Sequence, residues 1–189
     1  PLRLVGSEMC IRDRINSNGK IAVGAAIGVE NNAYLRLLEL LKFGVDIVFI
    51  DVAHAHTKTT LKFIEKAKKV LKKTPLIVGN IATKKAASDL ISAGVDAIKV
   101  GIGPGSICTT RVVTGVGIPQ LSAVMETFQV AKKFKIPVIA DGGIKTSGDI
   151  AKAIAGGASA CMIGSLFAGT EESPGKLLTI KSKKFKSYR

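Results

Sequence analysis

Residues 100–111, VGIGPGSICTTR, bring a thiol, three hydroxyl groups and a guanidinium together in one glycine-rich stretch. Cysteine thiolates are nucleophiles, and the positive charge of Arg111 is expected to lower the pKa of Cys108. The glycines allow a sharp turn whose backbone N–H groups can bind an anion, or whose carbonyls can bind a cation. Two interpretations of Cys108 remain open on these residues alone: a reactive nucleophile, or a small buried side chain, because free cysteine is often buried.

Two further polar groups end apolar runs later in the chain. Asp141 begins the sequence DGG, and Gly164 precedes Ser165. A carboxylate accepts hydrogen bonds from sugar hydroxyls, and backbone N–H groups at a helix start bind phosphate. The alternatives are structural: Asp141 caps a turn, and Gly164 and Ser165 only begin a helix.

Short apolar runs alternate with amphipathic stretches along most of the chain. The runs are predicted to be parallel strands buried on both faces, and they span residues 20–28, 46–53, 75–82, 97–103, 137–144 and 160–169. The helices between them are expected to begin at polar caps, namely Asn31 or Asn32, Thr83 and Ser147, and to end at Gly44, Gly94 and Gly156.

Glycines and polar residues follow nearly every predicted strand at its carboxyl end. An open doubly wound sheet concentrates such residues at one switch point, whereas a (β/α)₈ barrel uses every strand end. We therefore predict an α/β fold of the TIM-barrel type. Phosphate sites of such barrels commonly follow strands seven and eight. This places the visible strands at positions three to eight and predicts that strands one and two are missing.

Composition limits the remaining possibilities. The chain has 189 residues, about one domain, and a formal net charge of +14. Its lysines recur on helix faces such as residues 62–73 without interleaved aromatic side chains, which favours a solvated surface over a nucleic-acid site. No membrane-length apolar run occurs, and three widely spaced cysteines favour a reducing cytoplasm. Residues 1–14 carry three of the six arginines and show no periodicity, so we interpret them as a foreign or disordered leader, a sequence artefact, before a partial barrel over residues 15–189.

Several long motifs in a fixed order resemble the catalytic barrel of the IMP dehydrogenase/GMP reductase family. They are KVGIGPGSICTTR, TGVGIPQ, VIADGGIKTSGDIAKA, GSLFAGTEESPG and the terminal KSYR, within a resemblance that runs from Asn18 to Arg189. The resemblance implies NAD-dependent oxidation of inosine 5′-monophosphate (IMP) to xanthosine 5′-monophosphate through a covalent cysteine intermediate.

The resemblance also implies roles for individual residues. Cys108 matches the nucleophile and Thr110 the hydroxyl associated with activating water. The positions that match the nucleotide site are Ser106, Asp141, Gly142, Gly143, Gly164, Ser165 and Tyr188. Those that match the dinucleotide site are Asp51, Asn80 and Gly101. The carbonyls of Gly103, Gly105 and Cys108 match the ligands of a potassium ion.

The resemblance leaves two other functions open. GMP reductase shares the barrel, the cysteine and the phosphate loops, but uses NADPH to deaminate GMP. A barrel that binds a phosphorylated metabolite without thiol chemistry is the second alternative. The family's mobile flap and CBS module have no counterpart in these residues, so the 189-residue chain is expected to be inactive alone. The full-length protein is expected to be a cytoplasmic homotetramer.

Overall fold

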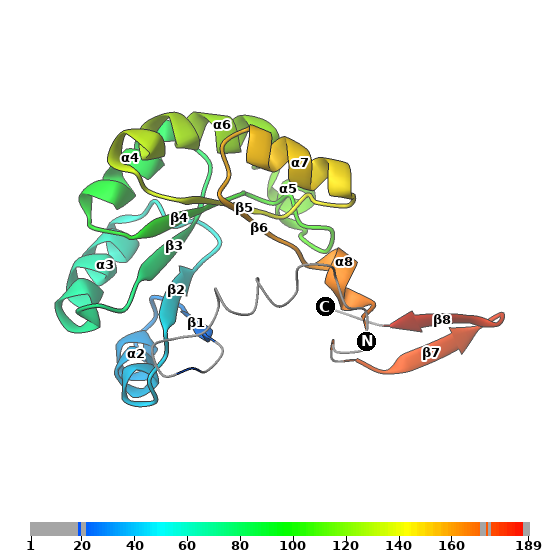
Figure 1. The fold of residues 1–189 in the computed structure, drawn as a ribbon, viewed down its shortest axis with the longest axis horizontal. Coiled ribbons are helices and arrows are strands. Elements are labelled where there is room, and N and C mark those ends of the chain that lie inside the picture. Colours follow the sequence, from blue (N-terminus) through cyan, green and yellow to red (C-terminus); the bar gives the residue numbers. More distant parts are fainter. Residues whose placement is uncertain (1–18, 20–21, 171–172, 174, 187–189) are drawn as a thin grey trace.

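The computed structural model describes residue 19, residues 22–170, residue 173 and residues 175–186 (Figure 1). Six parallel strands pair in chain order to form a curved sheet. Their bounds are β1 Gly24–Ile27, β2 Ile47–Asp51, β3 Leu76–Ile81, β4 Ala97–Val100, β5 Val138–Asp141 and β6 Ala160–Met162. The sheet curls into half of a barrel, which confirms the prediction of an incomplete (β/α)₈ fold.

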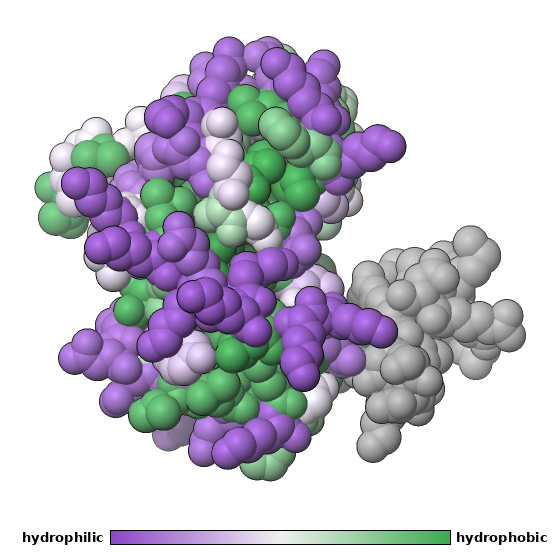
Figure 2. Space-filling model, turned by 90° about the vertical axis from the view of Figure 1, so that its left-hand side faces the viewer, coloured by the Kyte–Doolittle hydropathy of each residue, from purple (hydrophilic) through white to green (hydrophobic). Residues whose placement is uncertain are grey.

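Helices follow the strands (Figure 1). They are α2 Ala33–Lys42, α3 Lys58–Leu71, α4 Lys84–Ser92, α5 Thr110–Thr114, α6 Gln120–Ala131, the short 3₁₀ helix η1 Lys132–Phe134, α7 Ser147–Ala155 and α8 Ser165–Ala168. Of these, α2, α3, α4, α6 and α7 cover the convex side of the sheet, while the short α5 and α8 lie in loops after β4 and β6. Figure 2 shows the side formed by α2, α3 and α4, where hydrophilic side chains lie over much of the surface. Along α3 the lysines at the outward positions keep contact with solvent, as a solvated helix face requires.

The two faces of the sheet differ in burial. Val48, Ile98 and Val138 point to the helices and are completely buried. Phe49 and Ile139, on the opposite face, are partly exposed. The expectation that every strand is buried on both faces was therefore wrong: among the described strands only β4 is buried at all of its positions. The concave face of this six-stranded sheet does not close on itself, so most of its side chains keep contact with solvent.

The helix ends are partly as predicted. The Thr83 side chain accepts a hydrogen bond from Ala86 N and caps α4. The predicted cap Ser147 is wrong, because Thr146 holds the N-cap position in a capping box with Asp149. Asp149 sits three residues after Thr146, the spacing at which its carboxylate reaches back to the Thr146 N–H.

The predicted strand over residues 160–169 is also too long. It ends at Met162, and Ser165–Ala168 form α8. A short apolar run has no periodicity that separates strand from helix, which explains the error.

A β-hairpin follows the sheet and was not predicted. It consists of β7 Leu177–Ile180 and β8 Lys183–Lys186, paired antiparallel. Lys186 Nζ donates to the Ser173 carbonyl at 2.8 Å and so ties the hairpin to the segment before it. No helix within the described ranges is long and apolar enough to cross a membrane.

Candidate active site

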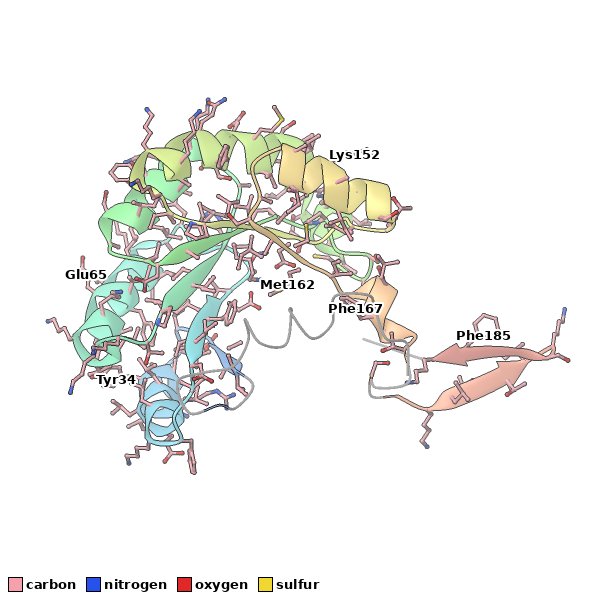
Figure 3. The ribbon with its side chains drawn as sticks, viewed as in Figure 1. Tyr34, Glu65, Lys152, Met162, Phe167 and Phe185 are labelled. Atoms are coloured by element: carbon pink, nitrogen blue, oxygen red, sulfur yellow. The ribbon has the colours of Figure 1, made fainter. Side chains whose placement is uncertain are left out.

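A cavity of about 200 Å³ lies at the carboxyl ends of the strands, between the loops after β4, β5 and β6. Its lining includes six of the seven residues predicted to bind the nucleotide: Ser106, Asp141, Gly142, Gly143, Gly164 and Ser165. The seventh, Tyr188, is outside the described residues. Met162, labelled in Figure 3, adds an apolar side chain to the same cavity. Residues from three separate loops thus form one pocket where the barrel fold places its sites.

Cys108 lies on the loop after β4, just before α5, and is exposed. The interpretation of Cys108 as a small buried side chain is therefore wrong. Its Sγ lies 3.3 Å from Thr110 Oγ1. Hydrogen bonds from Thr110 hold the pKa of the Cys108 thiol below its ordinary value, and the charge of Arg111 adds a smaller effect in the same direction. The thiol is thus accessible and biased toward the nucleophilic thiolate form.

Arg111 mainly stabilises the loop that carries Cys108, residues 101–109, which we call the cysteine loop. Its Nε donates to the Ile102 carbonyl at 3.1 Å and its Nη2 to the Ile118 carbonyl at 2.6 Å. A Cβ at Gly103, where φ is +73°, would lie 2.7 Å from Arg111 Cγ. Glycine at position 103 therefore serves both the backbone turn and the passage of the Arg111 side chain.

A buried cation joins the predicted nucleotide and dinucleotide residues. Lys99 on β4 is 2% exposed, and its Nζ lies 3.0 Å from Asp51 Oδ1 and forms a second ion pair with Asp141 Oδ2. Asn80 Nδ2 donates to the same oxygen of Asp141 at 2.9 Å and to the Gly101 carbonyl at 2.8 Å. The sequence patterns did not identify Lys99 as a functional residue. The available signals were a lone lysine inside the apolar run of residues 97–103 and its place as the first residue of the motif KVGIGPGSICTTR.

Gln120 at the start of α6 was missed as well. Its Nε2 donates to the Val100 carbonyl at 2.8 Å and to the Asp141 carbonyl at 3.1 Å, so it links the ends of β4 and β5. Position 101, where β4 ends close to β5, requires glycine, because a Cβ there would lie 2.2 Å from the Asp141 carbonyl oxygen. Gln120 is the last residue of the motif TGVGIPQ and follows a proline at a helix start, but these patterns gave it no role of its own.

Two buried acceptors near this cluster have no hydrogen-bond partner in the described part of the chain. They are Asn80 Oδ1 and Gln120 Oε1. Leaving a buried polar atom unpaired costs about 1–3 kcal/mol, so such atoms suit the donor groups of a ligand. Asn80, one of the three residues predicted for the dinucleotide, therefore offers an acceptor that fits a group with N–H donors, such as the carboxamide of nicotinamide.

The cysteine loop also fits the predicted monovalent cation in its chemistry. The Gly105 carbonyl accepts from Cys108 N at 3.1 Å, which closes a tight turn within residues 105–108. Backbone carbonyl oxygens are the ligands that potassium takes in proteins. The described residues hold no group of three or more His, Cys, Asp or Glu side chains able to bind a metal ion. A cation at this loop would thus depend on the carbonyls of Gly103, Gly105 and Cys108.

The curved parallel sheet, with a cavity and an exposed thiol at the strand ends, defines a barrel-type protein with a candidate site at the carboxyl rim. A sequence profile described as "IMP dehydrogenase / GMP reductase domain" matches residues 10–189, and the chain belongs to this family. The inosine-5′-monophosphate dehydrogenase of Helicobacter pylori is 59% identical over 171 residues, which are 90% of this chain and 35% of the relative. That of Methanocaldococcus jannaschii is 56% identical over 176 residues, or 92% and 35%.

Solved structures give the same fold. A variant of GMP reductase from Trypanosoma brucei superposes with a TM-score of 0.87 at 44% identity, over 93% of this chain and 39% of that protein. The same variant in complex with guanosine 5′-monophosphate also gives 0.87, over 91% and 36%. The chain spans about a third of the length of the curated relatives it matches.

Proposed function

We propose that the complete protein containing these residues oxidises IMP to xanthosine 5′-monophosphate. The observation that carries this proposal is that one cavity of about 200 Å³ is lined together by Ser106, Asp141, Gly142, Gly143, Gly164 and Ser165. The similarity to IMP dehydrogenases at 51–59% identity supports the substrate class. A nucleoside monophosphate has a phosphate, a ribose and a base, and the cavity offers small backbone loops, a carboxylate and apolar side chains.

In this proposal the Cys108 thiolate attacks C2 of the purine and forms a C–S bond. NAD⁺ supplies the acceptor for the hydride that leaves C2. Water then adds at C2, the C–S bond breaks, and xanthosine 5′-monophosphate and the thiolate are released. Thr110, 3.3 Å from the Cys108 sulfur, favours the thiolate and orients the water.

The remaining residues bind and orient the ligands. Asp141 accepts from the ribose hydroxyls, while the hydroxyls of Ser106 and Ser165 and the N–H groups of the neighbouring glycines bind phosphate. Asp51, Asn80 and Gly101 hold the dinucleotide beside the purine. The carbonyls of Gly103, Gly105 and Cys108 would hold a potassium ion, whose charge would keep the cysteine loop in shape. We further propose a cytoplasmic homotetramer.

A second candidate is GMP reductase activity, favoured by the two solved structures of that enzyme at 44% identity. The two candidate activities are distinguished by assaying the complete protein with IMP and NAD⁺ and, in parallel, with GMP and NADPH. We expect NADH production only in the first assay, and none after Cys108→Ser. NADPH consumption with GMP would replace the proposal by the reductase. Nucleotide binding without turnover in either assay would favour a non-catalytic barrel.

A further inference from the structure

Lys99 lies where the strand register brings three neighbouring positions to one side of the sheet. Asp51 on β2 is directly opposite Gly79 on β3, and Gly79 is directly opposite Lys99 on β4. Asp141 is two residues beyond Ile139, the partner of Lys99 on β5. Because side chains alternate along a strand, Asp51, Lys99 and Asp141 all point to the concave face.

Gly79 leaves the space that Lys99 needs to cross β3. A Cβ at Gly79 would lie 2.5 Å from Lys99 Cβ and 2.6 Å from the Lys99 carbonyl oxygen. The lysine therefore reaches a carboxylate two strands away on one side and another on the next strand on the other side. Three strands contribute to an arrangement in which a single buried ammonium bridges two carboxylates.

The hydrogen bonds select one oxygen of each carboxylate. Lys99 and Asn80 both donate to Asp141 Oδ2, and Lys99 donates to Asp51 Oδ1. The other oxygens, Asp141 Oδ1 and Asp51 Oδ2, take no hydrogen bond from any of the described residues. Asp141 lines the cavity, so the fixed carboxylate offers its second oxygen to a ligand.

We propose that Lys99 is a positioning residue that holds Asp141 toward the ribose hydroxyls of the nucleotide and Asp51 toward the second ligand. This inference rests on the proposed function and adds that one buried cation orders both ligand sites. Burying the Lys99 ammonium costs free energy of desolvation, and the ion pairs with the two carboxylates offset this cost. Removing the charge would take the Lys99 hydrogen bond from both carboxylates at once and leave Asp141 Oδ2 with the Asn80 hydrogen bond alone among the described residues.

The test compares Lys99→Met and Lys99→Arg in the complete protein, with Lys68→Met as the matched control. Lys68 also pairs with an aspartate, Asp96 at 2.9 Å, but on the helix side of the molecule. Dissociation constants are measured by calorimetry for IMP and for 2′,3′-dideoxy-IMP, which lacks the hydroxyls that Asp141 would bind. Thermal unfolding confirms that each variant is folded, and steady-state kinetics give KM for IMP and for NAD⁺.

We expect Lys99→Met to weaken IMP binding at least about tenfold, to weaken the dideoxy nucleotide much less, and to raise both KM values. Lys99→Arg should restore most of the preference for IMP, and Lys68→Met should leave both constants unchanged. Equal weakening of both nucleotides would show a merely structural role and overturn the inference. A rise in KM for IMP alone would overturn the shared role of Lys99.

The inference and the proposed function fail in different ways. A folded wild-type protein that binds no IMP would refute the proposed function, and the role of Lys99 in nucleotide recognition with it. A wild-type protein that binds IMP normally, together with a Lys99→Met variant that keeps its preference for IMP over the dideoxy analogue, would refute the inference alone.

Discussion

The convex and concave faces of the same six strands carry different kinds of residue. On the convex face, Val48, Ile98 and Val138 are completely buried under helices. The next residue on each of these strands points to the concave face. These residues are Phe49 and Ile139, which are partly exposed, and the charged Lys99. The alternation of a strand thus assigns consecutive residues to stability and to chemistry. Substitutions on the two faces, and at the strand ends, should therefore have different consequences.

Cys108→Ser should give the largest effect. If the exposed thiol at the end of β4 is the nucleophile, the variant of the complete protein should lose at least about 10³-fold in kcat, because a hydroxyl without a matched base is a poor nucleophile at neutral pH. The melting temperature should not change, since Cys108 is exposed. Turnover and thermal unfolding are measured on the same preparations. A variant that keeps more than a tenth of the wild-type rate would exclude covalent catalysis by this residue.

Substitutions on the convex face should lower the free energy of unfolding. Ile98→Ala removes a fully buried side chain on β4 and should lower the free energy of unfolding by about 3 kcal/mol. Ile139→Ala, at a partly exposed position on the concave face of the neighbouring strand, should cost roughly half as much. Urea denaturation of both variants measures the difference. Equal losses would mean that the concave face is as tightly packed as the convex one.

Gly79→Ala tests the position on β3 that the Lys99 side chain passes on its way from β4 to Asp51 on β2. The added Cβ would overlap the Lys99 backbone at 2.6 Å, so we expect a loss of about 2 kcal/mol in the free energy of unfolding and weaker nucleotide binding. Gly148→Ala is the matched control on α7, where the nearest atom to the new Cβ is 3.7 Å away. That variant should be about 0.5 kcal/mol more stable than wild type, because alanine restricts the unfolded chain and favours helix. Unchanged stability of Gly79→Ala would show that β3 and β4 separate readily.

Local patterns sufficed to predict most of the barrel strands and the rim at which several of the cavity residues meet. Apolar runs ending in glycine and polar residues mark strands whose carboxyl ends meet, so the sequence alone is enough to group Ser106, Asp141 and Gly164 at one rim. The exposure of Cys108 could not be decided from spacing. It follows from the loop before α5, whose turn points the thiol away from the core.

Lys99 and Gln120 illustrate what the sequence could not provide. A lysine in an apolar run does not reveal which carboxylates lie opposite, because this depends on the register that aligns Asp51, Gly79 and Lys99. Gln120 joins β4 to β5 from a helix outside both strands. Such pairings are properties of the tertiary fold, whereas strand and helix patterns are properties of neighbouring residues.

The two described cysteines provide the finest comparison between the strand-end loop and the sheet. Hydrogen bonds from Thr110 lower the pKa of Cys108, whereas burial raises the pKa of Cys161 on β6. Only the thiolate reacts with iodoacetamide, so Cys108 should be modified at lower pH than Cys161. With Cys10 replaced by serine, peptide mass spectrometry after timed alkylation at a series of pH values gives a rate profile for each thiol.

Thr110→Val should move only one of these two profiles. Loss of the hydroxyl removes the largest cause of the lowered pKa at Cys108, so its profile should shift to higher pH while that of Cys161 stays in place. Arg111→Gln should shift the Cys108 profile less, since the guanidinium charge is the smallest contribution and its hydrogen bonds go to the Ile102 and Ile118 carbonyls. A larger shift for Arg111→Gln than for Thr110→Val would mean that charge, not hydrogen bonding, controls the thiol.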